Sequence, residues 1–140
     1  MQEKLNELKM LLMEVSDLNL IGALLGWDQA TYMPPGGAEA RGRQSALMAR
    51  LAQERATDPR IGRLLDDLQP WSETLPYGSD EASLVRVARR NYERFLKVTP
   101  EWVARASQVG SDAYMAWTQA RPANDFKRML PYLEQILDLS

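Results

Sequence analysis

A proline- and glycine-rich corner constrains the fold of this chain more than any other part of its sequence. It reads Met33-Pro34-Pro35-Gly36-Gly37 and follows a long segment with helical periodicity. Pro34 disfavours the α conformation for Met33, and neither proline can donate the backbone hydrogen bond that a continuing helix needs. Gly36 and Gly37 give the backbone freedom at low steric cost, and Gly37 is an acceptable N-cap for a helix that follows it. The sequence therefore predicts two helices joined as a hairpin.

Two charged side chains flank this corner at similar distances along the chain. Asp28 lies on the helix before the corner, and Arg41 projects from the second turn of the helix after it. Because the chain reverses between them, we predict an ion pair between Asp28 and Arg41 that locks the hairpin. On the first helix, Trp27 and Thr31 share one face, since residues four apart are neighbours on a helix.

Hydrophobic periodicity predicts an all-α chain of about six antiparallel helices, with no strand and no internal repeat. The first helix covers residues 2–32, where apolar residues recur at steps of three and four. Ser16 and Asp17 could cap a second helix inside this range, so one long helix and two shorter ones in line both remain open. Gly22 and Gly26 lie one turn apart, and we predict that they form a notch for the close approach of another backbone.

Capping residues and prolines delimit the remaining helices. The second helix covers residues 38–56, and Asp58-Pro59 supplies the N-cap and first residue of the third, which Pro70 ends. We predict a long loop over residues 69–79, pinned by Trp71, Leu75 and Tyr77, and a helix after it that is capped by Ser79 or Asp80. The next helix should start at Thr99-Pro100-Glu101 and stop at Pro122. The last segment should open at Asn124 or Asp125, and a fresh helix should begin at Pro131. The residues of the fourth helix predicted to face inward are Leu84, Val85, Ala88, Tyr92, Phe95 and Leu96.

The composition is that of an ordinary soluble protein. The 140 residues are 45% hydrophobic and 26% charged, which suffices for one compact domain over 1–140. A net charge of −2 gives no overall attraction to nucleic acid or to an anionic membrane, and no window approaches the ~20 apolar residues of a membrane span. Interleaved charges at the N-terminus stand where a signal peptide needs an apolar core. We therefore expect a cytoplasmic protein with neither nucleic acid nor membrane as a partner.

The absence of histidine and cysteine restricts the chemistry that this chain can perform. It lacks the ligands of a His-Glu-x-x-His zinc site, a thiolate nucleophile and the base of a Ser-His-Asp triad. Two carboxylate pairs remain as candidates, Asp28 with Glu39 near the corner and Asp66 with Asp67. The structural alternative pairs Asp28 with arginine, places Glu39 at a helix N-terminus and leaves the aspartate pair solvated. We favour this alternative and assign no catalytic or metal-binding residue.

Three further features have both a functional and a structural interpretation. The Gly36-Gly37 pair ahead of Arg41 and Arg43 could hold a phosphate, but it lacks the pattern of a phosphate-binding loop, so we interpret it as a hinge. A basic stripe on the fourth helix could contact RNA or an acidic partner, and we interpret it as a solvated face made of Arg86, Arg90, Arg94 and Lys97. The tryptophans, interpreted as core anchors rather than stacking platforms, are Trp27, Trp71, Trp102 and Trp117.

The corner carries a family resemblance. Its pattern Trp-Asp-x-x-Thr-x-Met-Pro-x-Gly-Gly-x-x-x-Arg is similar to the amino-terminal signature of the M32 metallocarboxypeptidases, the thermostable carboxypeptidase Taq family. The residues that carry it are Trp27, Asp28, Thr31, Met33, Pro34, Gly36, Gly37 and Arg41. The similarity extends upstream to Leu11 and more loosely downstream to Leu133, but it covers only the first part of the family's length.

This resemblance implies a zinc- or cobalt-dependent enzyme that removes single residues from peptide C-termini. Such enzymes are almost wholly helical, have a deep cleft with N-terminal helices in one wall or lid, and are commonly homodimers. The family's histidine motifs fall downstream of the matched region, so the resemblance transfers no catalytic or metal role to this chain. What it transfers is the hairpin motif, as a structural element of a larger helical metallopeptidase fold.

We therefore expect the N-terminal fragment of a longer carboxypeptidase, inert alone and exposing an apolar surface that the rest of the enzyme covers. The apolar stripe of the last helix persists to Leu139 without a stop signal, which also favours a fragment. Peptide substrate is expected only in the full enzyme. One alternative is a freestanding helical interaction module without peptidase activity. A third and weaker one is a nucleic-acid binder that uses Arg86, Arg90 and Arg94.

Overall fold

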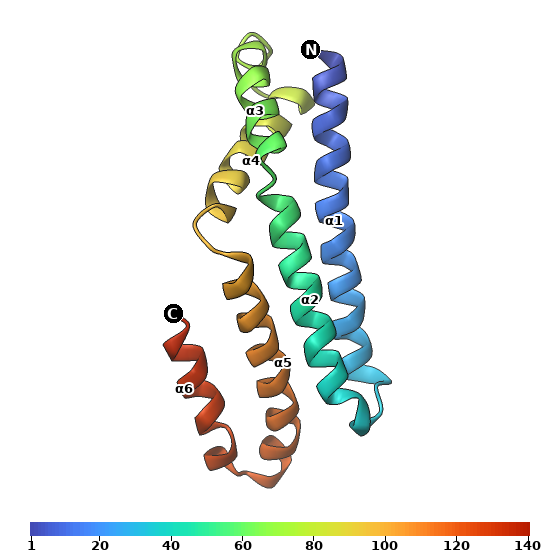
Figure 1. Ribbon diagram of the computed structural model, residues 1–140, viewed down its shortest axis with the longest axis vertical. Coiled ribbons are helices and arrows are strands. Elements are labelled where there is room, and N and C mark those ends of the chain that lie inside the picture. The colour runs from blue at the N-terminus through green and yellow to red at the C-terminus, as the bar shows by residue number, and fades with distance from the viewer. The chain divides into compact units, whose positions relative to one another are not determined.

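The computed structural model describes residues 1–140 and contains six α-helices and no strand (Figure 1). Its elements are α1 (Gln2–Thr31), a 3₁₀ turn (Pro35–Gly37), α2 (Ala38–Ala56), α3 (Pro59–Ser72), α4 (Asp80–Phe95), α5 (Pro100–Ala123), a second 3₁₀ turn (Phe126–Arg128) and α6 (Leu130–Asp138). The all-α class and the number of helices are confirmed. The first helix is continuous, which settles the choice between one long helix and two shorter ones.

The chain forms two compact units, each assembled from segments distant in sequence. Unit 1 consists of Met1–Asp17 and Ala52–Thr99, and unit 2 consists of Leu18–Leu51 and Pro100–Ser140. The helices α1 and α2 each contribute to both units. A single domain over 1–140 stays a prediction.

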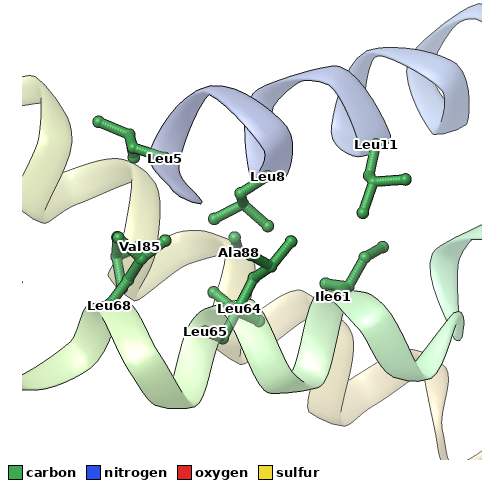
Figure 2. Close-up of a cluster of buried hydrophobic side chains, with 9 residues drawn as sticks. All are labelled: Leu5, Leu8, Leu11, Ile61, Leu64, Leu65, Leu68, Val85 and Ala88. Atoms are coloured by element: carbon green, nitrogen blue, oxygen red, sulfur yellow. The ribbon is translucent and has the colours of Figure 1, made fainter. Parts of the chain in front are cut away.

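The core of unit 1 is a cluster of leucines contributed by α1 and α3 and closed by α4. Figure 2 shows the α1 side chains facing those of α3, with the α4 side chains beside them. Leucines at steps of three on α1 and apolar residues at steps of three and four on α3 place each set on one helix face, which is the pattern that lets two helices bury a shared stripe. The cluster consists of Leu5, Leu8, Leu11, Ile61, Leu64, Leu65, Leu68, Val85 and Ala88.

A glycine permits close contact between α3 and α4. A Cβ atom on Gly62 would lie 2.8 Å from the hydroxyl oxygen of Tyr92 and 3.0 Å from its ring. Tyr92 itself packs against the unit 1 core as a partly buried residue. A larger residue at position 62 would have to displace this ring, so Gly62 leaves the room that Tyr92 occupies between the two helices.

The N-terminus of α3 is capped by Asp58. Its Oδ1 accepts a 2.8 Å hydrogen bond from the backbone N–H of Arg60, and its Oδ2 accepts from the Arg60 side chain at 2.8 and 3.0 Å. These hydrogen bonds, the side-chain bond first, hold the pKa of Asp58 below its usual value. The predicted cap and the proline that follows it are both confirmed.

Asp58 yields a prediction that separates the cap from its charge. Asp58→Ala removes both and should lower the free energy of unfolding by about 1 kcal/mol. Asp58→Asn keeps a good cap and should cost less, but it abolishes the pH-dependent part. Because the pKa of Asp58 is lowered in the folded state, its charge stabilises fully above the ordinary aspartate pKa and loses that effect as pH falls through the lowered pKa. Urea denaturation of the three proteins between neutral and acidic pH measures this, and equal acid sensitivity of wild type and Asp58→Asn would contradict it.

The prolines predicted to end α3 and α5 instead lie inside the last turns of these helices. Pro70 precedes the end of α3 by two residues and Pro122 precedes the end of α5 by one. A proline so close to a C-terminus removes a single helical hydrogen bond, and the last carbonyls find other donors. In α3, the Ser72 hydroxyl donates to the Gln69 carbonyl at 2.8 Å. In α5 the stop comes from Asn124, which has a positive φ of 54°, a conformation that asparagine tolerates after a helix.

The loop before α4 is shorter than predicted, because it begins only after α3 ends at Ser72. Trp71 lies on α3 and packs against the unit 1 core, and Leu75 is partly buried, but Tyr77 is mostly exposed. The Tyr77 ring is covered by the guanidinium of Arg86, 4.0 Å above its centroid. Ser79 is the N-cap of α4, as predicted, with its hydroxyl accepting from the backbone of Ala82.

The inward face predicted for α4 is confirmed as far as Tyr92, which packs against the core as a partly buried residue. Val85 and Ala88 are buried, and Leu84 packs against the core. Phe95 and Leu96 are exposed, so their prediction is wrong. The end of α4 is held by a polar contact instead, because the buried Gln53 amide donates to the carbonyls of Phe95 and Val98, at 2.7 Å each.

Unit 2 is built on α5, which packs side by side with α6 (Figure 1). The buried face of α5 consists mainly of small residues, namely Val109, Ser111, Ala113, Ala116 and Ala120. Small residues let helices approach closely. On α2, a Cβ atom added to the buried Gly42 would overlap the end of the Gln108 side chain of α5, so a larger residue would require this side chain to move.

The glycine notch predicted on α1 does not receive another backbone. No atom lies within 4 Å of a Cβ built on Gly22 or Gly26. Both glycines instead line a shallow depression of about 330 Å³, shared with Gly110 and Ser111 of α5. Gln29 also lines this depression, and its amide donates a 2.9 Å hydrogen bond to the Ser111 hydroxyl. A polar contact thus joins α1 and α5 where the sequence predicted close helix packing.

Candidate functional site: the helical corner

The corner is a tight, hydrogen-bonded reversal between α1 and α2. The backbone N–H groups of Tyr32 and Met33 both donate to the Asp28 carbonyl, at 3.0 and 2.9 Å, which closes the last turn of α1. Pro34 then has an extended conformation, and the 3₁₀ turn Pro35–Gly37 leads directly into α2. The stop at Met33 therefore has the physical cause that the sequence indicated.

The glycines of the corner serve a different purpose from the predicted one. No glycine in the chain has a positive φ, so the reversal does not use the conformations that only glycine adopts readily. Gly37 is instead in close contact, since an added Cβ would lie 3.1 Å from the Met33 side chain. It does not act as a separate N-cap either, because the 3₁₀ turn continues into the helix.

Arg41 makes three side-chain hydrogen bonds, two of which join α2 to α1 and one of which stays within α2. Its Nη2 donates a 2.6 Å hydrogen bond to Oδ2 of Asp28, and its Nη1 donates a 2.6 Å hydrogen bond to the backbone carbonyl of Leu25. Its Nε donates a 3.2 Å hydrogen bond to the side chain of Gln44. The Arg41 side chain is 13% exposed and the Asp28 side chain 37%. The predicted ion pair is confirmed, and the bond to Leu25 was not predicted, because a backbone acceptor leaves no sequence signal.

The remaining motif residues lie around this pair. The Thr31 hydroxyl donates 2.7 Å to the Trp27 carbonyl, within the last turn of α1. The rings of Trp27 and Tyr32 are 5.6 Å apart and tilted, and both are largely exposed. The corner thus brings the motif together as a structural lock with an aromatic outer edge. The carboxylate of Asp28 and the hydroxyl of Thr31 are both engaged in these structural hydrogen bonds.

The carboxylates of both candidate pairs form ion pairs with arginine or lysine side chains. Glu39 pairs with Arg43 at 2.6 Å, so it does not combine with Asp28. Asp66 pairs with Arg89 at 2.8 Å, and Asp67 pairs with Lys4 at 2.6 Å. Both aspartates are largely exposed, so the pair is solvated as predicted, and each aspartate also makes a surface ion pair.

The donor set of this chain does not fit a catalytic metal. No three residues among histidine, cysteine, aspartate and glutamate are grouped so that they could hold an ion. The sequence supplies neither imidazole nor thiolate, the ligands that zinc sites in proteins mainly use. No step of a metal-assisted reaction can therefore be assigned to these residues.

The predicted basic stripe is exposed along its whole length, but its last member, Lys97, lies beyond the end of α4 at Phe95. Its first member, Arg86, contacts residues close to it in the chain. The guanidinium lies over the Tyr77 ring and donates hydrogen bonds to the Tyr77 carbonyl and the Ser83 hydroxyl. The more buried arginine of this helix is Arg89, which the sequence reading did not single out and which pairs with Asp66. Its burial follows from its position next to the inward-facing Ala88.

The interpretation of the tryptophans as core anchors is wrong for three of them. Only Trp71 packs against a core, while Trp27, Trp102 and Trp117 are exposed. The indole nitrogen of Trp102 donates a 3.1 Å hydrogen bond to the carbonyl of Leu139, the residue that follows α6. Trp117 lines a mainly apolar pocket of about 370 Å³ with Phe126, where the chain turns between α5 and α6. Apolar periodicity alone cannot distinguish a face buried within the chain from one left open.

None of the six helices is both long enough and apolar enough to cross a membrane.

This architecture defines an all-helical scaffold, and the contacts of its corner motif are structural. Comparison with known proteins identifies the family to which the scaffold belongs. Residues 7–140 match the sequence model of the carboxypeptidase Taq (M32) metallopeptidases. Thermostable carboxypeptidase 1 of Thermus thermophilus is 39% identical over 127 residues, which cover 91% of this chain and 25% of that protein. This chain belongs to the M32 carboxypeptidase family.

Solved structures give the same result. A crystal structure of a protein named BsuCP has a TM-score of 0.90 and 27% identity, and the M32 carboxypeptidase of Deinococcus radiodurans R1 has a TM-score of 0.68 and 43% identity. In both cases the similarity covers 98% of this chain and 27% of the other. The chain thus spans about a quarter of the length of its relatives, and it is a helical segment of a larger metallopeptidase fold.

Proposed function

We propose that this chain is the N-terminal helical wall or lid segment of an M32 metallocarboxypeptidase and is not catalytic by itself. The observation that carries the proposal is that the family match covers residues 7–140, while this length contains no histidine, no cysteine and no group of metal ligands. The complete enzyme would release amino acids from the C-termini of peptides, with zinc or cobalt held by residues outside this chain. That metal would lower the pKa of a bound water and polarise the scissile carbonyl.

In this proposal the chain has a structural role in the wall of the cleft. The ion pair between Arg41 and Asp28 holds α1 and α2 together at the hairpin, and the leucine core packs α1 against α3 and α4. A rigid wall is needed because catalytic groups act only when substrate is held close to the reacting geometry. A homodimeric, cytoplasmic enzyme is part of the same proposal.

A chimera tests this function. Residues 1–140 would replace the matching N-terminal quarter of Thermus thermophilus thermostable carboxypeptidase 1, and the same enzyme without that quarter is the control. We expect the chimera to trim a peptide from its C-terminus, a chelator to abolish the activity, and the truncated control to be inactive. A folded but inactive chimera would favour the freestanding interaction module instead, and a fully active truncated control would show that the segment is dispensable.

A further inference from the structure

The second half of α1 has a composition that does not suit a helix on the surface. The ten residues from Leu18 to Trp27 contain no charged side chain, and only Asn19 among them has a polar one. A surface helix normally carries apolar residues on one face and charged residues on the other, whereas a helix that is apolar all round is buried on all sides. This segment is therefore built for burial on both of its faces.

Only one of these faces is used within the chain. On the inner face Leu18, Gly22 and Leu25 are partly buried, and Arg41 bonds the Leu25 carbonyl. The opposite face is open, with Leu20 64%, Leu24 62%, Trp27 56% and Ile21 48% exposed. Steps of three and four along the helix place these four residues on one stripe, which we name the outer α1 patch.

Ordinary surface composition does not explain the outer α1 patch. Single exposed apolar residues are common, but contiguous apolar patches on soluble proteins mark sites of interaction. The patch continues into the corner, because Trp27 lies 5.6 Å from the ring of the exposed Tyr32. Trp27 also belongs to the corner motif, and no core within this chain accounts for it.

We infer that the outer α1 patch is the surface on which the downstream part of the carboxypeptidase polypeptide packs. This inference rests on the proposed function and adds the location of the contact. The relatives extend over about four times the matched length, so about three quarters of each lies outside the region that this chain covers. A segment of the same polypeptide covers such a patch without the entropy loss of bringing two molecules together, which favours it over a second copy of the chain.

The test compares one double variant in two contexts. Leu20→Glu with Leu24→Glu should leave the melting temperature of the isolated chain nearly unchanged, because both side chains are exposed there. In the chimera described above, the same variant should lower the melting temperature by several degrees and reduce peptidase activity. Leu20→Met with Leu24→Met is the matched control, since it keeps the patch apolar and should leave both proteins unaffected.

Two further readouts decide between the occupants. The isolated wild-type chain should bind a hydrophobic dye, the glutamate variant should bind less, and the chimera should bind little. A chimera that is active but insensitive to the glutamate variant would overturn the inference and leave the proposed function intact, whereas an inactive chimera of the wild-type sequence would count against the function itself. An isolated chain that sediments as a dimer, and becomes a monomer in the glutamate variant, would assign the patch to a second copy and overturn the inference.

Discussion

Leu65→Ala should lower the free energy of unfolding of this chain by about 2–5 kcal/mol, the largest effect that we expect from any single substitution. Leu65 is 0% exposed at the centre of the unit 1 cluster, where α3 meets α1 and α4 (Figure 2). Alanine would forfeit the burial of the side chain and leave a cavity that the surrounding helices cannot fully close. Urea denaturation followed by circular dichroism measures the loss.

The control for this prediction is the same substitution at an exposed leucine. Leu24→Ala in the isolated chain should change stability by less than about 0.5 kcal/mol, because the Leu24 side chain is 62% exposed. Comparable losses for the two variants would mean that the cluster around Leu65 is not the core. Such a result would also contradict the open outer face of α1.

Arg41→Ala should be the second most damaging change, with a loss of about 2 kcal/mol. It leaves the Asp28 carboxylate without its cation and the Leu25 carbonyl without one of its donors. This loss is smaller than the loss expected for a fully buried ion pair, because the Asp28 side chain is 37% exposed and water can partly solvate its carboxylate once the arginine is removed. Asp28→Asn should cost less than Arg41→Ala, since the amide oxygen can still accept from Arg41.

A matched control lies two residues further along α2. Arg43 pairs with Glu39 at the same 2.6 Å distance as Arg41 with Asp28, but the Arg43 and Glu39 side chains are both highly exposed. Arg43→Ala should therefore cost less than about 0.5 kcal/mol. Thermal unfolding of the variants measures the difference, and an unchanged melting temperature in both Arg41→Ala and Asp28→Asn would refute the role of the corner as a lock.

The sequence was sufficient wherever the decisive chemistry is local. The bounds of α2 and the caps Asp58 and Ser79 followed from residue types whose effect depends on their immediate neighbours. The Asp28 and Arg41 pair could also be predicted, because a tight reversal leaves few options for two opposite charges placed symmetrically about it.

The misinterpreted positions depend on atoms that the sequence pattern does not specify. Pro70 and Pro122 were expected to end helices, but a proline in the last turn costs only one hydrogen bond that the helix end can spare. Phe95 and Trp117 carry apolar periodicity and yet are exposed. Periodicity indicates which face is apolar, and only the structure shows whether this chain contains anything to cover that face.

The most direct test of the central claim is a peptidase assay of the purified chain alone, supplied with Zn²⁺ or Co²⁺ and a peptide substrate. We predict no release of C-terminal amino acids, because the proposed reaction requires metal ligands and these 140 residues contain no histidine, no cysteine and no group of three candidate ligands. Release of C-terminal residues that a chelator abolishes would contradict the account.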